Sequence, residues 1–332
     1  MATIYEVATL AGVSPATVSR VMNGLRVSPE KAELVRSAAA KLKFTPNRTA
    51  RTLRRQNSEV IALLLPDIEN PYFTSMARGV EDAAQAAGFS LVMCNTDEDP
   101  SKEARYLDIA VSENMAGVII APASDHTELT QLLERGRPVV AVDRSTRYDV
   151  DAVMMSNRPA GRDAAQSLVD SGYRRIACIT GPEDIETAME RAIGWRTAVE
   201  AAGGSATSDL LRFSTFRVDG GRAAMEDLLA SAEPPDAVVA TNNLMGVGAL
   251  QVLTERGLTP PRFGVAVVGD LPFTTLSPAA ITIVRLPARH MGTTAARMLL
   301  ARIEGDAEPA HTVVLRNEVV PASLISGATA GR

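Results

Sequence analysis

Short apolar runs rich in valine, isoleucine and alanine alternate with helix-like segments from about residue 60 onwards, and this alternation strongly constrains the fold. The expected strands are 60–66, 90–95, 116–122, 138–143, 175–180, 210–214, 236–241 and 265–270. The expected helices are 71–88, 101–113, 125–136, 159–171, 187–202, 219–231 and 242–256. Runs that are apolar throughout indicate parallel strands buried on both faces, and short connections imply right-handed crossovers. The pattern predicts an α/β fold, and its repetition after about residue 158 predicts two lobes, each with its own sheet.

A body of two lobes also predicts where a ligand binds. In parallel α/β sheets, ligands bind beyond the carboxyl ends of the strands. Two lobes whose strand ends face each other enclose a cleft, which can close by a hinge motion. We therefore expect a small-molecule site built from polar and aromatic residues that directly follow the strands.

The N-terminal segment differs from this body in its charge. Residues 1–57 hold ten lysines and arginines against three acids, a balance of +7, which leaves −12 for the remainder of a chain whose net charge is −5. A basic head on an acidic body indicates nucleic-acid binding. A solvated charged face is the plainer interpretation, and charge alone does not choose between the two.

Three helices are expected in the basic head. Thr3 and Glu6 form a capping-box pattern at the start of the first helix, 4–10. A glycine-containing turn leads to the second helix, 15–22, and the third follows a serine cap at Ser28. A helix, a short turn and a second short helix are typical of the helix-turn-helix unit.

In a helix-turn-helix unit the second helix enters the major groove of DNA. The outward positions of this helix are Pro15, Ala16, Ser19 and Arg20. Arg20 can donate two hydrogen bonds to guanine, which is worth about 1–3 kcal/mol of discrimination, whereas Thr17 and Ser19 are expected to contact phosphates. A three-helix subdomain without nucleic acid is the alternative, but it leaves the basic charge and the polar outward face unexplained.

The head resembles that of the lactose/purine repressor (LacI) family in the string "VS-x-x-TVSRV-x-NG" and the later "PN-x-x-AR-x-L". The resemblance implies that Pro15, Ala16 and Arg20 read bases, and it places Asn23 in the DNA-binding motif. It also implies a hinge helix at 47–55 that packs against its dimer mate in the minor groove. The DNA contacts expected there are Asn47, Ala50, Arg51, Leu53 and Arg54, with Leu53 as the wedge between base pairs. Without the head, a flexible linker would be the preferred interpretation of this segment.

The body is similar to periplasmic sugar-binding proteins, the core that this repressor family carries. The resemblance implies effector contacts at strand ends. Asn70, Tyr72 and Phe73 match an "NP-aromatic-F" loop, and Asp143 and Arg144 match a pair that holds ring hydroxyls in ribose-type binders. The remaining candidates are Ser124, Arg191, Phe216, Asn242, Asp270 and Arg285. A core aromatic and a helix-surface arginine are the plainer interpretations of Phe73 and Arg191.

The chain departs from the family pattern in the body. "VVGDLPF" stands where the family usually has "VGFDD" or "VGYDD", so that only Asp270 remains near the position of the ligand-binding acid. Asn243 replaces another usual acid, and Arg285 stands where sugar binders often have glutamine. A more cationic pocket would favour an anionic effector, such as a sugar acid or sugar phosphate. If Arg285 points to solvent, a neutral pentose or hexose is expected, and both alternatives stay open.

These observations predict a DNA-binding transcription regulator, a repressor in the simplest case, acting as a homodimer on a pseudo-palindromic operator under the control of a sugar-type effector. The predicted domains are a helix-turn-helix head (1–46), a hinge (47–58) and an effector-binding body (59–332). The predicted lobes are 59–158 with 288–318, and 159–287 with 319–332. A regulator that has lost its effector response and a sugar transport receptor are the alternatives.

An enzyme is not expected, because His126, His290 and His311 lie in separate segments without metal-ligand spacing, and there is no G-x-S-x-G or P-loop motif. No cofactor and no metal are therefore expected. The N-terminus lacks the pattern of a signal peptide, and no apolar run is long enough for a membrane helix. The two cysteines lie in apolar runs and are expected to be buried thiols. We expect a bacterial cytoplasmic protein, associated with the nucleoid when bound to its operator.

Overall fold

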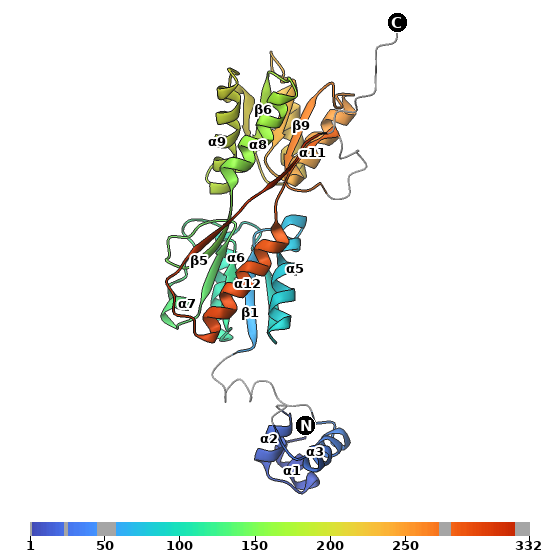
Figure 1. Cartoon of the computed structure of the whole chain (residues 1–332), viewed down its shortest axis with the longest axis vertical. Helices are drawn as coiled ribbons and strands as arrows, with labels where there is room; N and C mark the ends of the chain where they lie inside the picture. The colour runs from blue at the N-terminus through green and yellow to red at the C-terminus, as the bar shows by residue number, and fades with distance from the viewer. Residues whose placement is uncertain (1, 23–25, 45–57, 272–279, 323–332) are drawn as a thin grey trace. The chain divides into compact units, whose positions relative to one another are not determined.

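The computed structural model describes residues 2–22, 26–44, 58–271 and 280–322. It divides into two compact units, Met1–Ser58 and Glu59–Arg332, which are described separately. The predicted fold class is confirmed: N-terminal helices are followed by a body of two α/β lobes (Figure 1). None of the helices in the described ranges is long and apolar enough to cross a membrane.

The head consists of α1 (Ile4–Ala11), α2 (Pro15–Met22) and α3 (Pro29–Lys41). Small and branched apolar side chains from all three helices form its core: Val7, Ala8, Ala11, Val18, Val35, Ala38 and Ala39. Only Val18 of α2 is fully buried, so this helix docks on its neighbours through a narrow face.

Two of the three helices of the head have a side-chain cap. The capping box is formed: the Thr3 N–H donates to Glu6 Oε2 at 2.6 Å, and the Glu6 N–H donates to Thr3 Oγ1 at 3.3 Å. At the start of α2, Ser14 Oγ accepts a hydrogen bond from the Thr17 N–H at 3.2 Å. Ser28 occupies the cap position of α3 but makes no side-chain cap bond, so that helix begins at Pro29 without one.

Replacing Thr3 by alanine is expected to destabilise the head by about 1 kcal/mol, because the Thr3 hydroxyl that accepts from the Glu6 N–H at the start of α1 is lost. Hydrogen exchange on the full chain measures this loss as faster exchange of the α1 amides. Thr9→Ala is the matched control, because Thr9 Oγ1 donates only to the Tyr5 carbonyl within the same exposed helix. Equal acceleration in both variants would contradict the role of the capping box.

The first lobe is built on a sheet of order β11-β5-β4-β3-β1-β2 in which every pair is parallel. Its strands are β1 (Val60–Leu65), β2 (Ser90–Asn95), β3 (Gly117–Ile120), β4 (Val139–Val142), β5 (Asp151–Met155) and β11 (Thr312–Leu315). Its helices are α5 (Pro71–Ala86), α6 (Pro100–Ser112), α7 (Thr130–Glu134) and α12 (Ala288–Glu304). The central strands are buried along their length, as the continuous apolar runs predict, whereas the edge strand β2 is partly exposed.

The second lobe has a sheet of order β12-β10-β9-β8-β6-β7. Its strands are β6 (Ile176–Thr180), β7 (Leu211–Phe213), β8 (Ala237–Ala240), β9 (Gly264–Val268), β10 (Thr282–Arg285) and β12 (Glu318–Val320). Its helices are α8 (Asn157–Asp170), α9 (Glu186–Ala201), the short 3-10 helix η1 (Ser208–Leu210), α10 (Val218–Leu229) and α11 (Asn243–Glu255). One pair departs from the expected parallel pattern, because β12 runs antiparallel to β10.

The chain passes between the lobes three times in the described part, between β5 and α8, between β10 and α12, and between β11 and β12 (Figure 1). The crossing segments are held together by side chains. Ser156 Oγ donates to the Leu315 carbonyl at 3.2 Å, and Asn317 Nδ2 donates to the Ser156 carbonyl at 2.9 Å. The two lobes therefore share a connected region that can serve as a hinge.

The helix expected over 125–136 is much shorter in the structure, where α7 covers only Thr130–Glu134. Buried Glu103 explains the difference, because its carboxylate accepts hydrogen bonds from the Ala123 N–H at 2.7 Å and from Thr127 Oγ1 at 2.5 Å. These bonds hold the segment after β3 as a loop. Burial raises the pKa of Glu103, and the bonds from its two partners oppose that rise.

Candidate functional site

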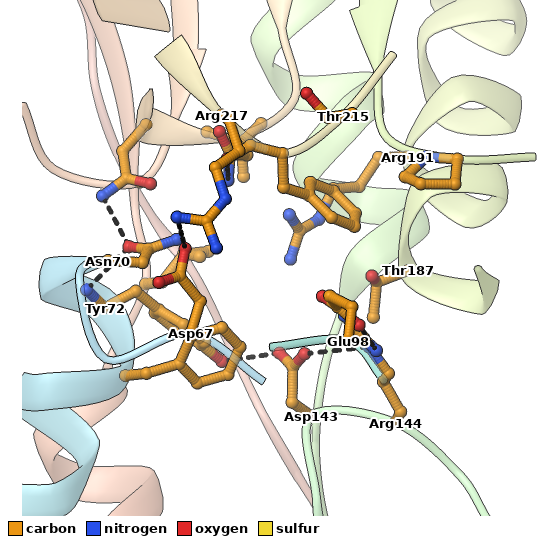
Figure 2. A pocket seen from close by; sticks show the side chains of 18 of the residues that line it. Asp67, Asn70, Tyr72, Glu98, Asp143, Arg144, Thr187, Arg191, Thr215 and Arg217 are labelled. Carbon is orange, nitrogen blue, oxygen red and sulfur yellow. Dashed lines mark hydrogen bonds and ion pairs between the residues drawn. The ribbon is translucent and has the colours of Figure 1, made fainter. Parts of the chain in front are cut away.

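A cavity of about 280 Å³ lies between the two lobes, beyond the carboxyl ends of their strands (Figure 2). Its lining residues come from both lobes: Asp67, Asn70, Tyr72, Phe73, Asp97, Glu98, Asp143, Arg144, Pro182, Thr187, Arg191, Thr215, Phe216, Arg217, Asn242, Asn243, Val268, Gly269 and Leu286. This is the region that the topology of parallel sheets assigns to ligands. Its volume is just below the roughly 300–1,000 Å³ typical of small-molecule sites.

Tyr72 and Asp143 form one wall of the cavity in the first lobe. The Tyr72 hydroxyl donates to Asp143 Oδ1 at 2.8 Å (Figure 2). Burial, and then the charge of Asp143, raise the pKa of Tyr72 far above its usual value, so the phenol keeps its proton and acts as a donor. Tyr72 is placed at the start of α5 by Asn70, whose Oδ1 caps the helix by accepting from the Tyr72 N–H at 3.0 Å.

Arg144, next to Asp143 at the end of β4, is held rigidly. Its two terminal nitrogens each donate to a Glu98 carboxylate oxygen at 2.7 Å, and Nη1 also donates to the Pro122 carbonyl at 3.1 Å. Burial works against the charge of Arg144, but Glu98 outweighs it and the pKa is raised. Within the described residues the buried Nε has no hydrogen-bond partner, and Asp143 Oδ2 lies 3.9 Å from it.

Arg191 reaches the cavity from α9 in the second lobe (Figure 2). Its Nε donates to Asn157 Oδ1 at 2.9 Å and its Nη1 to the Thr241 carbonyl at 2.8 Å, neither of which carries a charge. Burial lowers the pKa of Arg191, and the charge of Asp143 acts in the opposite direction. An arginine side chain nevertheless stays protonated in proteins, so Arg191 presents a buried positive charge with donor capacity to spare.

The position of Arg191 depends on close packing of α8 against α9. A Cβ atom on Gly161 would lie 2.0 Å from the Arg191 carbonyl oxygen, and one on Gly194 would lie 2.1 Å from the Arg158 carbonyl oxygen. Only glycine at both positions allows this approach of the two helix backbones. The sequence pattern of α8 and α9 therefore fixes how far Arg191 extends towards the cavity.

Phe216 and Asn242 complete the wall of the second lobe. The Phe216 ring lies against the Arg144 guanidinium, whose central carbon is 6.0 Å from the ring centroid. Asn242 Oδ1 caps α11 by accepting from the Met245 N–H at 2.8 Å, and its Nδ2 donates to the Phe216 carbonyl at 3.4 Å. Part of the hydrogen-bonding capacity of Asn242 is therefore used within the protein.

Three effector candidates from the sequence do not line this cavity: Ser124, Asp270 and Arg285. Arg285 Nε donates instead to Asp270 Oδ1 at 3.0 Å, and its Nη1 donates to Glu318 Oε2 at 3.3 Å. The Arg285 side chain is 49% exposed, and the two acids neutralise it. The inference that Arg285 makes the pocket more cationic is corrected accordingly. Ser124 lines a neighbouring cavity.

Sequence reasoning did not single out several lining residues, notably Asp67, Glu98 and Arg217. Asp67 and Glu98 follow β1 and β2, so the strand-end rule applied to every strand would have found them. Arg217 lies across the cleft from the first lobe, and its Nη1 donates to Glu69 Oε2 at 2.8 Å. This partnership connects residues far apart in the sequence and leaves no local signal.

Further hydrogen bonds join the lobes on both sides of the cavity. Asn243 Nδ2 donates to Asn70 Oδ1 at 3.0 Å, in a buried position. At another point of the cleft, the Ser145 N–H and Oγ donate to Glu186 Oε2 at 3.1 Å and 2.6 Å. The protein's own side chains therefore hold the two lobes together in this structure.

In the head, Ala16 and Arg20 are exposed on α2, while Pro15, Thr17 and Ser19 are partly exposed. The Thr17 hydroxyl lies 3.0 Å from Ser14 Oγ, so the cap of α2 engages it. The other candidates, Asn23, Asn47, Ala50, Arg51, Leu53 and Arg54, lie outside the described residues, as does the expected hinge helix.

The described residues contain no group of three or more histidine, cysteine, aspartate or glutamate side chains that could hold a metal ion. Both cysteines, Cys94 and Cys178, are buried and free. Burial raises the pKa of both thiols, which makes them weak nucleophiles. The polar groups of the cavity are instead carboxylate, guanidinium, amide and hydroxyl groups, which bind ligands by hydrogen bonding.

Comparisons with known proteins agree with this division of the chain. "Bacterial regulatory proteins, lacI family" matches residues 3–47, and "Periplasmic binding proteins and sugar binding domain of LacI family" matches residues 58–326. The HTH-type transcriptional regulator CelR of Thermobifida fusca is 35% identical over 330 residues, covering 94% of this chain and 95% of the relative. The ribose operon repressor of Escherichia coli K12 is 34% identical over 310 residues, covering 91% and 93%.

Solved structures give the same result. The complex of the transcriptional regulator CelR with cellobiose aligns with a TM-score of 0.73 at 32% identity, over 97% of this chain and all (100%) of that chain. The lac repressor dimer bound to operator and the anti-inducer ONPF aligns with a TM-score of 0.86 over 97% and 99%, and at 24% identity it shows the shared fold alone. With both units matched and relatives aligned over nearly its whole length, the chain belongs to the lacI family of bacterial regulatory proteins.

Proposed function

We propose that this protein is a sequence-specific DNA-binding repressor whose affinity for its operator is controlled by a sugar bound in the cavity between the lobes. The observation that carries the proposal is the cavity itself, which lies in the body of a chain that also carries a helix-turn-helix head. Relatives with the same two-part organisation are named as transcriptional regulators and operon repressors. Regulation rather than catalysis is therefore the proposed role, in the bacterial cytoplasm where the operator DNA lies.

The chemistry of the cavity suits a polyhydroxylated ligand. Asp143 offers a carboxylate acceptor, and Arg191 offers donors. The Phe216 ring offers an aromatic face for the C–H side of a sugar ring. Acceptors and donors that flank an aromatic face are the groups that bind ring hydroxyls with a defined orientation.

The charge balance supports a neutral sugar over an anionic derivative. The four lining acids outnumber the three lining arginines: Asp67, Asp97, Glu98 and Asp143 against Arg144, Arg191 and Arg217. Arg144 is already paired with Glu98, and Arg217 with Glu69, whose nearest oxygens lie at 2.7 Å and 2.8 Å. Of the three lining arginines, only Arg191 is left without a carboxylate partner to bind a phosphate or carboxylate group of a ligand.

A homodimer is proposed, because two heads are needed to read the two halves of a pseudo-palindromic operator. The edge of the first lobe offers apolar side chains for contact with a second copy, where Val92 and Met93 on β2 and Ile109 on α6 are 39%, 47% and 46% exposed. Effector binding would change how the lobes sit and thereby the contacts between two first lobes. In this proposal the segment 47–58 transmits that change to the heads.

Two alternatives are less well supported. A regulator that has lost its effector response would not need the buried acceptor and donors that face each other across the cavity. A sugar transport receptor has no use for a helix-turn-helix head, which the lacI family match assigns to residues 3–47.

Replacing Arg20 by alanine is expected to reduce discrimination between operator and unrelated DNA by about 1–3 kcal/mol, because a bidentate contact to guanine is lost. Fluorescence anisotropy with operator and scrambled duplexes at fixed salt measures this difference. Arg36→Ala is the matched control, since Arg36 is an exposed arginine of the head on α3 rather than α2. Equal loss of binding to both duplexes in the Arg20 variant would refute the base-reading role.

A further inference from the structure

A small cavity of about 110 Å³ lies in the second lobe, and its lining residues differ from those of the proposed effector cavity. Its apolar walls come from Leu168, Tyr173, Pro261 and Val265. Val265 and a further lining residue, Thr282, stand at the amino ends of β9 and β10. Ligands of parallel sheets bind beyond the carboxyl ends of the strands. This cavity therefore lies at the opposite end of the sheet from the effector site.

The protein's own contacts hold the walls of this cavity in place. The Tyr173 hydroxyl donates to the Pro261 carbonyl at 2.7 Å, and Thr282 Oγ1 lies 2.6 Å from Ser167 Oγ. Gly264 leaves room for the Tyr173 ring, because a Cβ atom there would lie 2.6 Å from Cε2 of that ring. An apolar cavity of roughly 150 Å³ binds a benzene molecule, so the smaller cavity here has room for one aliphatic side chain.

The last described residue of the chain, Ala322, lies in the wall of this cavity. Its N–H donates to Thr282 Oγ1 at 3.2 Å, which fixes the backbone there. Two residues earlier, the half-buried Val320 of β12 packs against the main apolar core. The sequence continues after Ala322 with Ser323, Leu324 and Ile325, so large apolar side chains follow directly.

The strand β12 has little of its own to hold it in the second lobe. It consists of three exposed or half-exposed residues, Glu318–Val320, at the edge of the sheet beside β10. A short edge strand with few buried apolar contacts opens at low cost in free energy. The same strand ends the crossing from β11, one of the three described crossings between the lobes. An apolar contact directly after β12 would keep this crossing attached to the second lobe.

We propose that residues 323–325 of the same chain dock in this cavity and that the Leu324 side chain fills it. Side chains alternate between the two faces of an extended chain, so continuing β12 brings Leu324 to the face that carries Val320 and Ala322. Two extended residues span at most about 7 Å, which keeps Leu324 next to the cavity wall at Ala322. Docking buries a large apolar side chain and holds the end of the third crossing in the second lobe.

Hydrogen exchange on the full-length protein and on Leu324→Asp tests the docking. The amides of β12 and of Ala322 are expected to exchange about tenfold or more faster in the variant, because burial of a leucine side chain is worth at least that ratio and a charge does not enter an apolar cavity. A variant that ends at Ala322 is expected to show the same acceleration.

Thr329→Asp is the matched control, because it adds the same charge five residues beyond Leu324. Its β12 amides are expected to exchange at the wild-type rate. If Leu324→Asp and the variant that ends at Ala322 also exchange at the wild-type rate, or if Thr329→Asp accelerates exchange as much as Leu324→Asp, docking of Leu324 is refuted.

A disulfide test shows which copy supplies the segment. Ser171 is exposed and lines the cavity, so Ser171→Cys combined with Leu324→Cys is expected to form a disulfide within one chain on mild oxidation. Glu183→Cys with Leu324→Cys is the control pair, because Glu183 is exposed after β6 at the carboxyl end of the sheet. Cross-linking only between chains, in a mixture of the two single variants, would assign the cavity to a second copy and overturn the proposal.

Discussion

Replacing Asp143 by asparagine is expected to weaken effector binding about 100-fold, because a hydrogen bond to a charged group is worth up to about 3 kcal/mol and a tenfold ratio corresponds to about 1.4 kcal/mol. Asp143 has a φ of 66°, a left-handed conformation that asparagine also adopts readily. The amide oxygen can still accept from the Tyr72 hydroxyl, so the local structure is preserved. What the variant loses is the negative charge that faces Arg191 and the ligand.

Calorimetric titration with the tightest-binding sugar measures this change, and anisotropy measures operator affinity without effector, which is expected to stay the same. Asp170→Asn is the matched control: Asp170 is an exposed residue at the end of α8 whose carboxylate accepts from Gln166 Nε2 at 2.8 Å, far from the cavity lining. An Asp143 variant that binds the sugar as well as the control variant would show that the ligand does not contact this acid.

The sequence allowed the architecture to be predicted because the central strands are apolar along their whole length. β1, β3, β4, β6, β8 and β9 are buried as such runs require. The orientation of β12 was not predictable in this way. The orientation of β12 depends on where the chain turns after its last crossing between the lobes. The strand has only three residues, Glu318–Val320, all exposed or half-exposed, so it shows no apolar pattern from which a strand could be predicted.

The candidate site was predictable where a residue follows a strand directly, as Asp143 follows β4. Prediction failed where a partner decides the direction of a side chain. Arg285 was predicted to contact the effector from its position in the family pattern. Its side chain does not line the cavity, and Asp270 and Glu318 neutralise its charge. Glu98 follows β2, but its role depends on Arg144, which is 46 residues further along the chain.

Asn243 stands where the family pattern has an acid, and the structure gives a physical reason for the amide. Its Nδ2 donates to Asn70 Oδ1 across the cleft, and the same Asn70 oxygen caps α5 by accepting from the Tyr72 N–H. Asn243 is only 4% exposed. A carboxylate here would face an oxygen that cannot donate, and turning the Asn70 amide would remove the helix cap. The amide therefore allows the lobes to meet without a ligand.

Asn243→Asp is expected to destabilise the joined lobes by about 3 kcal/mol at neutral pH, because a buried charge is left without a donor. Burial raises the pKa of the introduced carboxylate above its unfolded value. The deficit is therefore smallest at low pH, where the protonated group can donate to Asn70. It grows as the pH rises above the unfolded pKa and levels off above the folded pKa. Thermal unfolding from pH 4 to 8 measures it, with the exposed Asn114→Asp, beside Arg137, as control. A loss of stability independent of pH would mean that the Asn243–Asn70 hydrogen bond does not join the lobes.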